Sequence, residues 1–370
     1  MKNCFIQIIL FTFLCVCTSC KSKESKTQFE AKPIVKTVGK IDVMVDPNVE
    51  MMMILGRLSG ASPYNFDNNL LKSPYIDDVD SYFLPYKDEP AVNMSRKNNM
   101  NYGVFPEFGM YMNKDNSGFI MDINNKNFIS ANYNLPAKKI TFYIDNQYIN
   151  EIRNFRQKSN FDTFFINQKH IYEEQINQIE QILSKDNFSD WLEEFYGIKI
   201  KGKINLHVTY LTGGGNFGLS IRDSKGKETL NSVIAAVRNE ESFLYLISHE
   251  FSHPLTSGVV EKLYSNEKIS SKFDKLYYKY SHVYLQNGYN SGMTVLNENI
   301  NQACANKYIE KVFPESVMKA YSEWEISENR KMIYVPQIAE FLDNYQNNRD
   351  KYKTLEDFIP ELEKFILTLE

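Results

Sequence analysis

The stretch FLYLISHEFSHPLTSG, residues 243–258, carries the strongest structural signal in the chain. It holds His249 and His253 four positions apart, with Glu250 directly after the first histidine. Residues four apart lie on one face of an α-helix, about one turn from each other. Asn239 is a good N-cap, and the two glutamates that follow it complement the positive end of the helix dipole. We therefore predict a helix that begins just after Asn239 and presents both imidazoles on one side.

Pro254 limits this helix on its C-terminal side. Proline lacks a backbone N–H and disfavours helical geometry at the residue before it. We expect the helix to end or kink here, with the turn from His249 to His253 intact. Two further helical turns beyond the histidines are not expected.

The motif suits metal chemistry. Two imidazoles at this spacing can bind one Zn²⁺ ion as adjacent ligands. Glu250 then projects toward the side of the metal where water binds, and it can move that water's proton to a leaving amine. Because the chain has only five histidines, a chance HExxH on a buried helix is the weaker interpretation. We predict a zinc site with Glu250 as general base.

A zinc hydrolase needs a third protein ligand. Downstream, we predict a helix over VLNENINQACANKYI, residues 295–309. HExxH followed by Asn297-Glu298 resembles the gluzincins, the zincin metallopeptidases whose third ligand is glutamate. The resemblance implies a zincin-like domain that hydrolyses peptide bonds, with His249, His253 and Glu298 as ligands. In the thermolysin-like branch, an aspartate four residues after the third ligand orients a histidine. Gln302 stands there instead, so an amide or a backbone carbonyl would have to serve.

Three further features bear on this interpretation. The chain lacks the HxxGxxH continuation of the metzincins. In zincins, a strand edge beside the metal pairs with the substrate, and residues 231–237 are the strand nearest the motif in sequence. Oxyanion stabilisation normally adds a tyrosine or histidine donor, and nothing selects among the candidates His282, Tyr308, Tyr321 and Tyr334. We expect His170 and His207 to be structural.

The rest of the chain predicts an α+β protein. Alternating apolar residues predict strands, and apolar residues spaced by three and four predict helices. Pro47 and Gly60 bound one such helix, and a Ser189 cap and Gly197 bound another. The expected strands are 34–45, 138–145, 203–211, 218–223 and 230–237; the expected helices are 47–60, 164–183, 188–197 and most of the chain after 239; residues 85–135 are expected to form loops with short elements.

The N-terminus has the pattern of a lipoprotein signal. A basic start and a short apolar run lead to Thr18-Ser19-Cys20, which resembles a bacterial lipobox and implies lipidation of Cys20. Cys17 is a competing acceptor, and an ordinary secretory signal is the alternative. Cys304 then remains as a free thiol, which we expect to be buried. We expect a signal peptide over 1–19, a tether over 20–40, an α+β region over 41–158 and the zincin-like domain over 159–370.

Composition restricts the partners. The formal net charge is −4 and no long basic run is present, which argues against nucleic acid. The whole chain also resembles a family of bacterial lipoproteins of unknown function with an HEFSH core, on VEMMMILGRLSG, DEPAV and HEFSHP. We expect a monomeric, lipid-anchored zinc peptidase of the cell envelope, facing the periplasm or the surface. The alternatives are an envelope lipoprotein that binds a peptide or glycan at a vestigial zinc site, and a structural protein.

Overall fold

The computed structural model describes residues 30–61, 73–98, 100, 102–112, 146–213, 215–222 and 228–370. Cys20, its signal peptide and the predicted strand 138–145 lie outside these residues. The chain is an α+β protein with one small mixed sheet, as the sequence predicts. Within the described part, no helix combines the length and the apolar character that a membrane crossing requires.

Five strands form the sheet, in the order β1-β2-β3-β5-β4. Their bounds are Ile34–Val38 (β1), Ile41–Val45 (β2), Ile204–Thr209 (β3), Phe217–Arg222 (β4) and Glu228–Ala235 (β5). Strands β2, β3 and β5 are parallel, while β1 and β4 are antiparallel edge strands. The expected edge at 231–237 is therefore wrong, because β5 is paired on both sides and β4 is the edge. The sheet also joins β1 and β2, which precede the expected boundary at residue 158, to strands that follow it.

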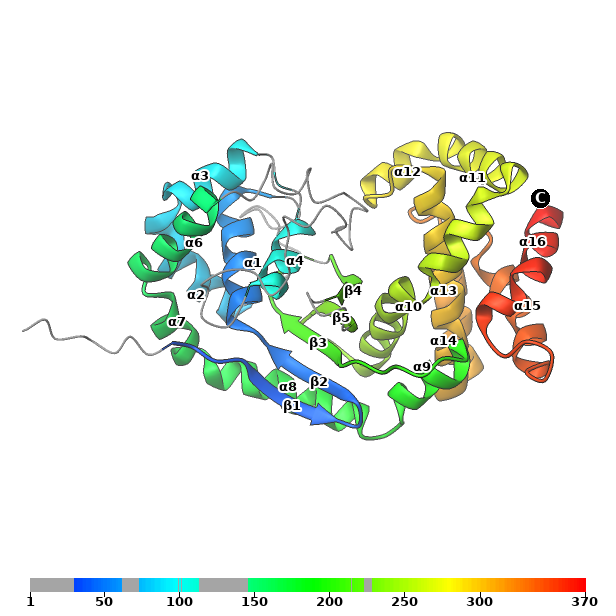
Figure 1. The fold of residues 1–370 in the computed structure, drawn as a ribbon, viewed down its shortest axis with the longest axis horizontal. Coiled ribbons are helices and arrows are strands. Elements are labelled where there is room, and N and C mark those ends of the chain that lie inside the picture. The colour runs from blue at the N-terminus through cyan, green and yellow to red at the C-terminus, as the bar shows by residue number, and fades with distance from the viewer. Residues whose placement is uncertain are drawn as a thin grey trace, which may run out of the picture.

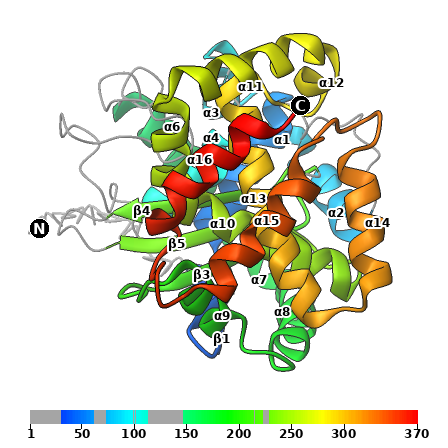
Figure 2. The same cartoon turned by 90° about the vertical axis from the view of Figure 1, so that its right-hand side faces the viewer.

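Helices surround the sheet (Figure 1). Those that precede β3 are α1 (Pro47–Ser59), α2 (Pro74–Phe83), α3 (Pro90–Lys97), α4 (Val104–Tyr111), α6 (Asn146–Lys158), α7 (Phe161–Asn167), α8 (Lys169–Leu183) and α9 (Phe188–Tyr196). Those that follow β5 are α10 (Glu240–Ser265), α11 (Glu267–Lys279), α12 (Ser281–Gln286), α13 (Gly292–Val312), α14 (Glu315–Glu325), α15 (Val335–Asn347) and α16 (Ile359–Thr368). Helices α1–α4, α6 and α7 lie to the left of the sheet in Figure 1, and α10–α16 lie to its right; Figure 2 shows the second group from its outer side.

Local chemistry explains both ends of α1 and the C-terminal end of α9. Helix α1 begins at Pro47 after an Asp46 cap and ends at Gly60, whose φ of 77° is left-handed. Helix α9 ends at Gly197 as predicted, again with a positive φ. The Ser189 cap is wrong: the N-cap is Asn187, and the helix already includes Phe188.

Helix α10 starts as predicted but does not stop at Pro254. The Asn239 side chain accepts a hydrogen bond from the Ser242 amide at 2.8 Å, which caps the helix. The helix then continues through Pro254 to Ser265, so the expected end is wrong. Because proline has no N–H, the Glu250 carbonyl loses its usual partner four residues on. Gly218 of β4 lies against this carbonyl, and a Cβ there would sit 1.5 Å from its oxygen.

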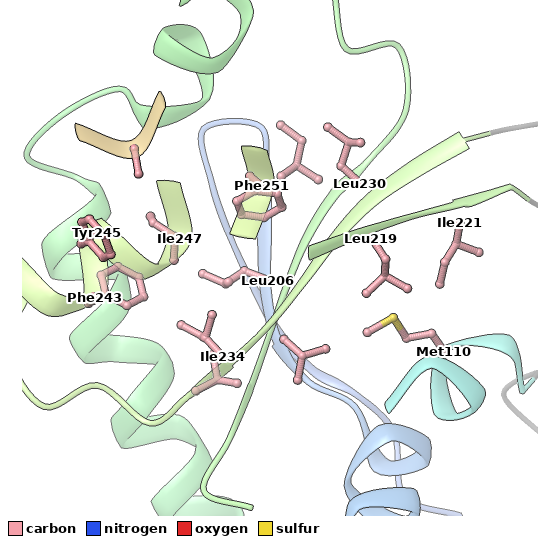
Figure 3. Close-up of a cluster of buried hydrophobic side chains, with 14 of the residues drawn as sticks. Met110, Leu206, Leu219, Ile221, Leu230, Ile234, Phe243, Tyr245, Ile247 and Phe251 are labelled. Atoms are coloured by element: carbon pink, nitrogen blue, oxygen red, sulfur yellow. The ribbon is translucent and has the colours of Figure 1, made fainter. Parts of the chain in front are cut away.

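The core lies on both sides of the sheet (Figure 3). Leu206, Leu230 and Ile234 from the strands meet the buried apolar side chains of α10, among them Phe251. On the other side of β4, Met110 of α4 lies near Leu219 and Ile221. The sheet thus supports the helix that carries both histidines. Cys304 is a buried free thiol on α13, as expected.

Candidate metal centre

Helices α10 and α13 pack against each other and bring three candidate ligands together. His249 Nε2 and His253 Nε2 lie 3.1 Å apart. Glu298 Oε2 lies 3.5 Å from His249 Nε2, and Glu298 Oε1 lies 3.6 Å from His253 Nε2. The three side chains are between 10% and 18% exposed. The residue set predicted from HExxH and Asn297-Glu298 therefore converges on one point.

The spacing fits a tetrahedral divalent metal ion. With metal–nitrogen and metal–oxygen bonds of about 2.05 Å, tetrahedral ligand atoms lie about 3.3 Å apart. The observed separations of 3.1, 3.5 and 3.6 Å bracket this value. Two imidazole nitrogens and a carboxylate are also the donor types that zinc takes in catalytic sites, which leave a fourth position open. The donor set alone does not select zinc over other divalent ions.

Glu250 lies beside the three ligands without joining them. Its two carboxylate oxygens are 4.0 Å from His249 Nε2 and 3.9 Å from His253 Nε2. At these distances the Glu250 carboxylate lies next to the candidate ligand atoms but makes no hydrogen bond to either imidazole nitrogen. The arrangement suits a base that acts on a bound water molecule.

Two asparagines of α13 hold His253. The side-chain nitrogens of Asn301 and Asn297 lie 2.8 and 3.2 Å from His253 Nδ1. A histidine that binds a metal through Nε2 carries its proton on Nδ1 and needs an oxygen there. Turning both amides by 180° exchanges their oxygen and nitrogen atoms and supplies the Asn301 oxygen to Nδ1–H. Thr256, whose hydroxyl lies 2.5 Å from the other end of the Asn301 amide and 3.0 Å from the Ser252 carbonyl, can then accept from Asn301.

The other two candidate ligands, Glu298 and His249, have fewer hydrogen-bond partners than His253. Gln302 Nε2 donates to Glu298 Oε2 at 3.2 Å, so the residue four positions after the third ligand orients that ligand and not a histidine. His249 Nδ1 is buried, and among the described residues it has no hydrogen-bond partner. The ring of Tyr245 lies parallel to the His249 ring, with centroids 6.3 Å apart.

Burial sets the charge state of the centre. It lowers the pKa of His249 to about 3, against the opposing effect of the Glu298 charge and with smaller contributions from His253 and Arg330, and it also lowers the pKa of His253. Both imidazoles are therefore neutral near pH 7 and able to donate a lone pair to a metal. Burial and the Glu298 charge raise the pKa of Glu250 well above its usual range. A carboxyl tuned upward in this way suits both uptake and return of a proton.

Comparison with protein families places the chain. The family model described as a domain of unknown function, DUF4932, matches residues 41–365. The chain belongs to the DUF4932 family. Neither the curated proteins nor the solved structures gave a match. The match to the DUF4932 model spans nearly all of the described residues, including both helices that carry the candidate ligands, and its description names no activity.

The candidate oxyanion donors predicted for this DUF4932 protein lie in other surroundings. Tyr321 stacks on Tyr245, with centroids 4.3 Å apart. Tyr334 packs against Phe273 and under Lys272, and His282 is exposed. No contact between any of these three and the metal ligands is found among the described residues. The fourth candidate, Tyr308, donates to Asp186 at 3.2 Å.

Three other residues border the centre and escaped the sequence analysis. The Tyr289 side chain is within hydrogen-bonding reach of both Glu298 and Arg330. Burial and the charges of Glu250 and Glu298 raise the pKa of Tyr102, which precedes α4. A Cβ on Gly288 would lie 3.8 Å from the Tyr102 hydroxyl, so segments far apart in the sequence meet here. Tyr289, Arg330 and Tyr102 belong to no motif, and no sequence signal separates them from the other tyrosines and arginines.

Proposed function

We propose that the protein is a zinc-dependent peptidase, exported and anchored to the cell envelope through Cys20. The observation that carries the proposal is the convergence of His249, His253 and Glu298, with ligand atoms all within 4.8 Å of one another. Glu250 lies beside them, with its carboxylate oxygens 4.0 Å from His249 Nε2 and 3.9 Å from His253 Nε2. Three ligands and an adjacent carboxylate form the arrangement that metal-assisted hydrolysis requires.

Four residues around the centre then have defined roles. Zinc, when bound, supplies a Lewis acid that polarises a carbonyl and makes water acidic. Glu250 takes the proton of the attacking water and delivers it to the nitrogen of the leaving amine. Asn301 fixes the tautomer and the ring orientation of His253. Tyr289, which reaches Glu298, and Tyr102, whose pKa is raised by burial and by the charges of Glu250 and Glu298, are the candidates for stabilising the oxyanion.

The test compares two matched carboxylate changes on α10. We expect the zinc-loaded mature chain to cleave members of a mixed peptide library, detected by mass spectrometry, and Glu250→Gln to slow cleavage by about 10²- to 10⁴-fold. Glu250→Gln leaves the three ligands in place, so its zinc content should equal that of the wild type. Glu261→Gln makes the same chemical change at an exposed position of the helix and should leave the rate unchanged.

Two results would contradict the proposal. One is the absence of cleavage by wild-type protein that carries stoichiometric zinc, which would favour the binding lipoprotein. The other is equal cleavage by wild type and Glu250→Gln, which would exclude Glu250 as the base.

A further inference from the structure

Two buried arginine side chains of the described chain, Arg156 and Arg57, each face a carboxylate. Arg156 donates from Nε and Nη2 to the two carboxylate oxygens of Asp162, at 2.9 and 2.6 Å. Arg57 forms the same two-point pair with Asp80. A guanidinium is always charged, so removing it from water is unfavourable unless an anion faces it.

Arg330 lacks such a partner. Its Nη1 donates to Asn287 Oδ1 at 3.0 Å, and its Nε is buried without a hydrogen-bond partner. Among the described residues, no carboxylate lies within ion-pair distance of it. The guanidinium instead lies over Trp324, 4.4 Å from the ring centroid, and over Tyr289 at 5.7 Å. Two aromatic rings therefore hold the plane of a cation whose Nε edge is unpaired.

A chain of ring contacts connects Arg330 with the metal centre. Trp324 meets Tyr245 edge to face, with centroids 6.0 Å apart, and Tyr245 lies parallel to His249. Tyr289 reaches both Arg330 and Glu298. Arg330 therefore borders the site in which a substrate would lie.

Charge favours an anionic ligand at this position. Glu250 and Glu298 contribute at most two negative charges, when both are ionised, and Arg330 contributes one positive charge. A divalent ion at the three ligands would add two more, which leaves a net positive site in surroundings largely removed from water. A neutral peptide cannot offset this charge, whereas a carboxylate can, and the planar fork of arginine matches a carboxylate at two points.

We propose that Arg330 recognises a substrate carboxylate while Trp324 and Tyr289 hold the guanidinium plane. This inference rests on the proposed function, because the carboxylate belongs to a peptide bound at the metal centre. The group is either the C-terminal carboxylate of the peptide or an acidic side chain close to the scissile bond. The first would make the enzyme cleave near free C-termini, and the second would make it cleave beside Asp or Glu.

The test measures binding rather than turnover. Zinc-loaded Glu250→Gln protein is titrated with three probes: acetyl-Ala-Phe-Ala as the free acid, the same peptide as its amide, and acetyl-Ala-Phe-Asp amide. Affinity is measured by calorimetry and, independently, by the fluorescence of Trp324, since the other tryptophan, Trp191, is buried among aromatic rings. We expect at least one carboxylate probe to bind about 10- to 100-fold more tightly than the neutral amide, the range for hydrogen bonds to charged groups.

Substitutions of Arg330 then separate recognition from structure. In Arg330→Gln the preference for the carboxylate probe should fall below about twofold, and in Arg330→Lys it should be intermediate, because lysine keeps the charge but not the fork. Lys319→Gln removes an exposed cation from α14 and should change nothing. Zinc content should be the same in all four proteins. Preference for the free acid identifies the C-terminal carboxylate, and preference for the Asp probe identifies an acidic side chain.

The failures of the two proposals are distinguishable. If peptides are cleaved but acid and amide bind equally, the peptidase stands and the inference about Arg330 is overturned. If carboxylate probes bind through Arg330 but no peptide is ever cleaved, the inference stands and the peptidase fails. Equal weakening of acid and amide in Arg330→Gln would also overturn the inference, since it would indicate a purely structural role.

Discussion

Two buried acidic clusters, one at the metal centre and one around Glu50, differ in how their acceptor atoms are satisfied. Glu50 of α1 is 1% exposed and accepts a hydrogen bond from the Tyr75 hydroxyl, which in turn lies 2.9 Å from the Tyr172 hydroxyl. Burial raises the pKa of Glu50 to about 7. This cluster supplies its own donors and requires no ligand.

The metal centre has the opposite balance. Two imidazole nitrogens and a carboxylate face one another at 3.1 to 3.6 Å, and no hydroxyl or ammonium of the described chain stands between them. Neutral lone pairs this close repel unless a cation or a proton lies among them. Burial and a shifted pKa occur in both clusters, so neither property identifies function. The difference that favours a metal ion at the candidate centre is the convergence of three ligand atoms on one point.

The largest expected effect is on stability in the presence of zinc. Because only the folded chain assembles the three ligands, zinc at a thousand times its dissociation constant should add about 4 kcal/mol to the free energy of unfolding. Thermal and denaturant unfolding should show this gain in the wild type and in Glu50→Gln, but not in Glu298→Ala. An equal gain in Glu298→Ala would mean that zinc binds elsewhere.

The Glu50 cluster should respond to pH. The pKa of Glu50 is about 7 in the folded chain and about 4.5 when unfolded, so the unfolded state loses its proton first. Its contribution to stability is fully present below pH 4.5 and decreases by about 3 kcal/mol as the pH rises to 7. Glu50→Gln should lack this decrease, measured as the difference from wild type in urea unfolding at each pH. Glu340→Gln makes the same change at an exposed position and should keep the wild-type pH dependence. An identical pH slope in wild type and Glu50→Gln would refute the assignment.

A smaller effect is expected at Asn301. Its amide holds His253 rather than the metal, so Asn301→Ala should weaken zinc affinity by about 10- to 100-fold. Asn301→Asp retains an acceptor for Nδ1–H and should restore affinity to the wild-type value or above. Competition with a zinc chelator measures both variants. If Asn301→Asp binds zinc as weakly as Asn301→Ala, Asn301 serves packing and not orientation.

The sequence predicted those features that depend on residues within one or two helical turns of each other. The N-cap at Asn239 and the imidazole pair followed from local spacing, and Glu298 followed from the family resemblance. The continuation of α10 past Pro254 could not be predicted, because Gly218, which makes room for the freed Glu250 carbonyl, lies in another part of the chain. Arg330 and Tyr289 were missed for the same reason, since only the fold brings them to α13.

Metal content is the most direct test of the account. The mature chain, purified without chelator and with zinc in the growth medium, should contain about one zinc ion per chain by elemental analysis. Glu298→Ala, prepared in parallel, should contain much less. No metal in the wild-type protein, and none taken up when zinc is added, would mean that His249, His253 and Glu298 do not form a metal site, and the proposed peptidase would be excluded with it.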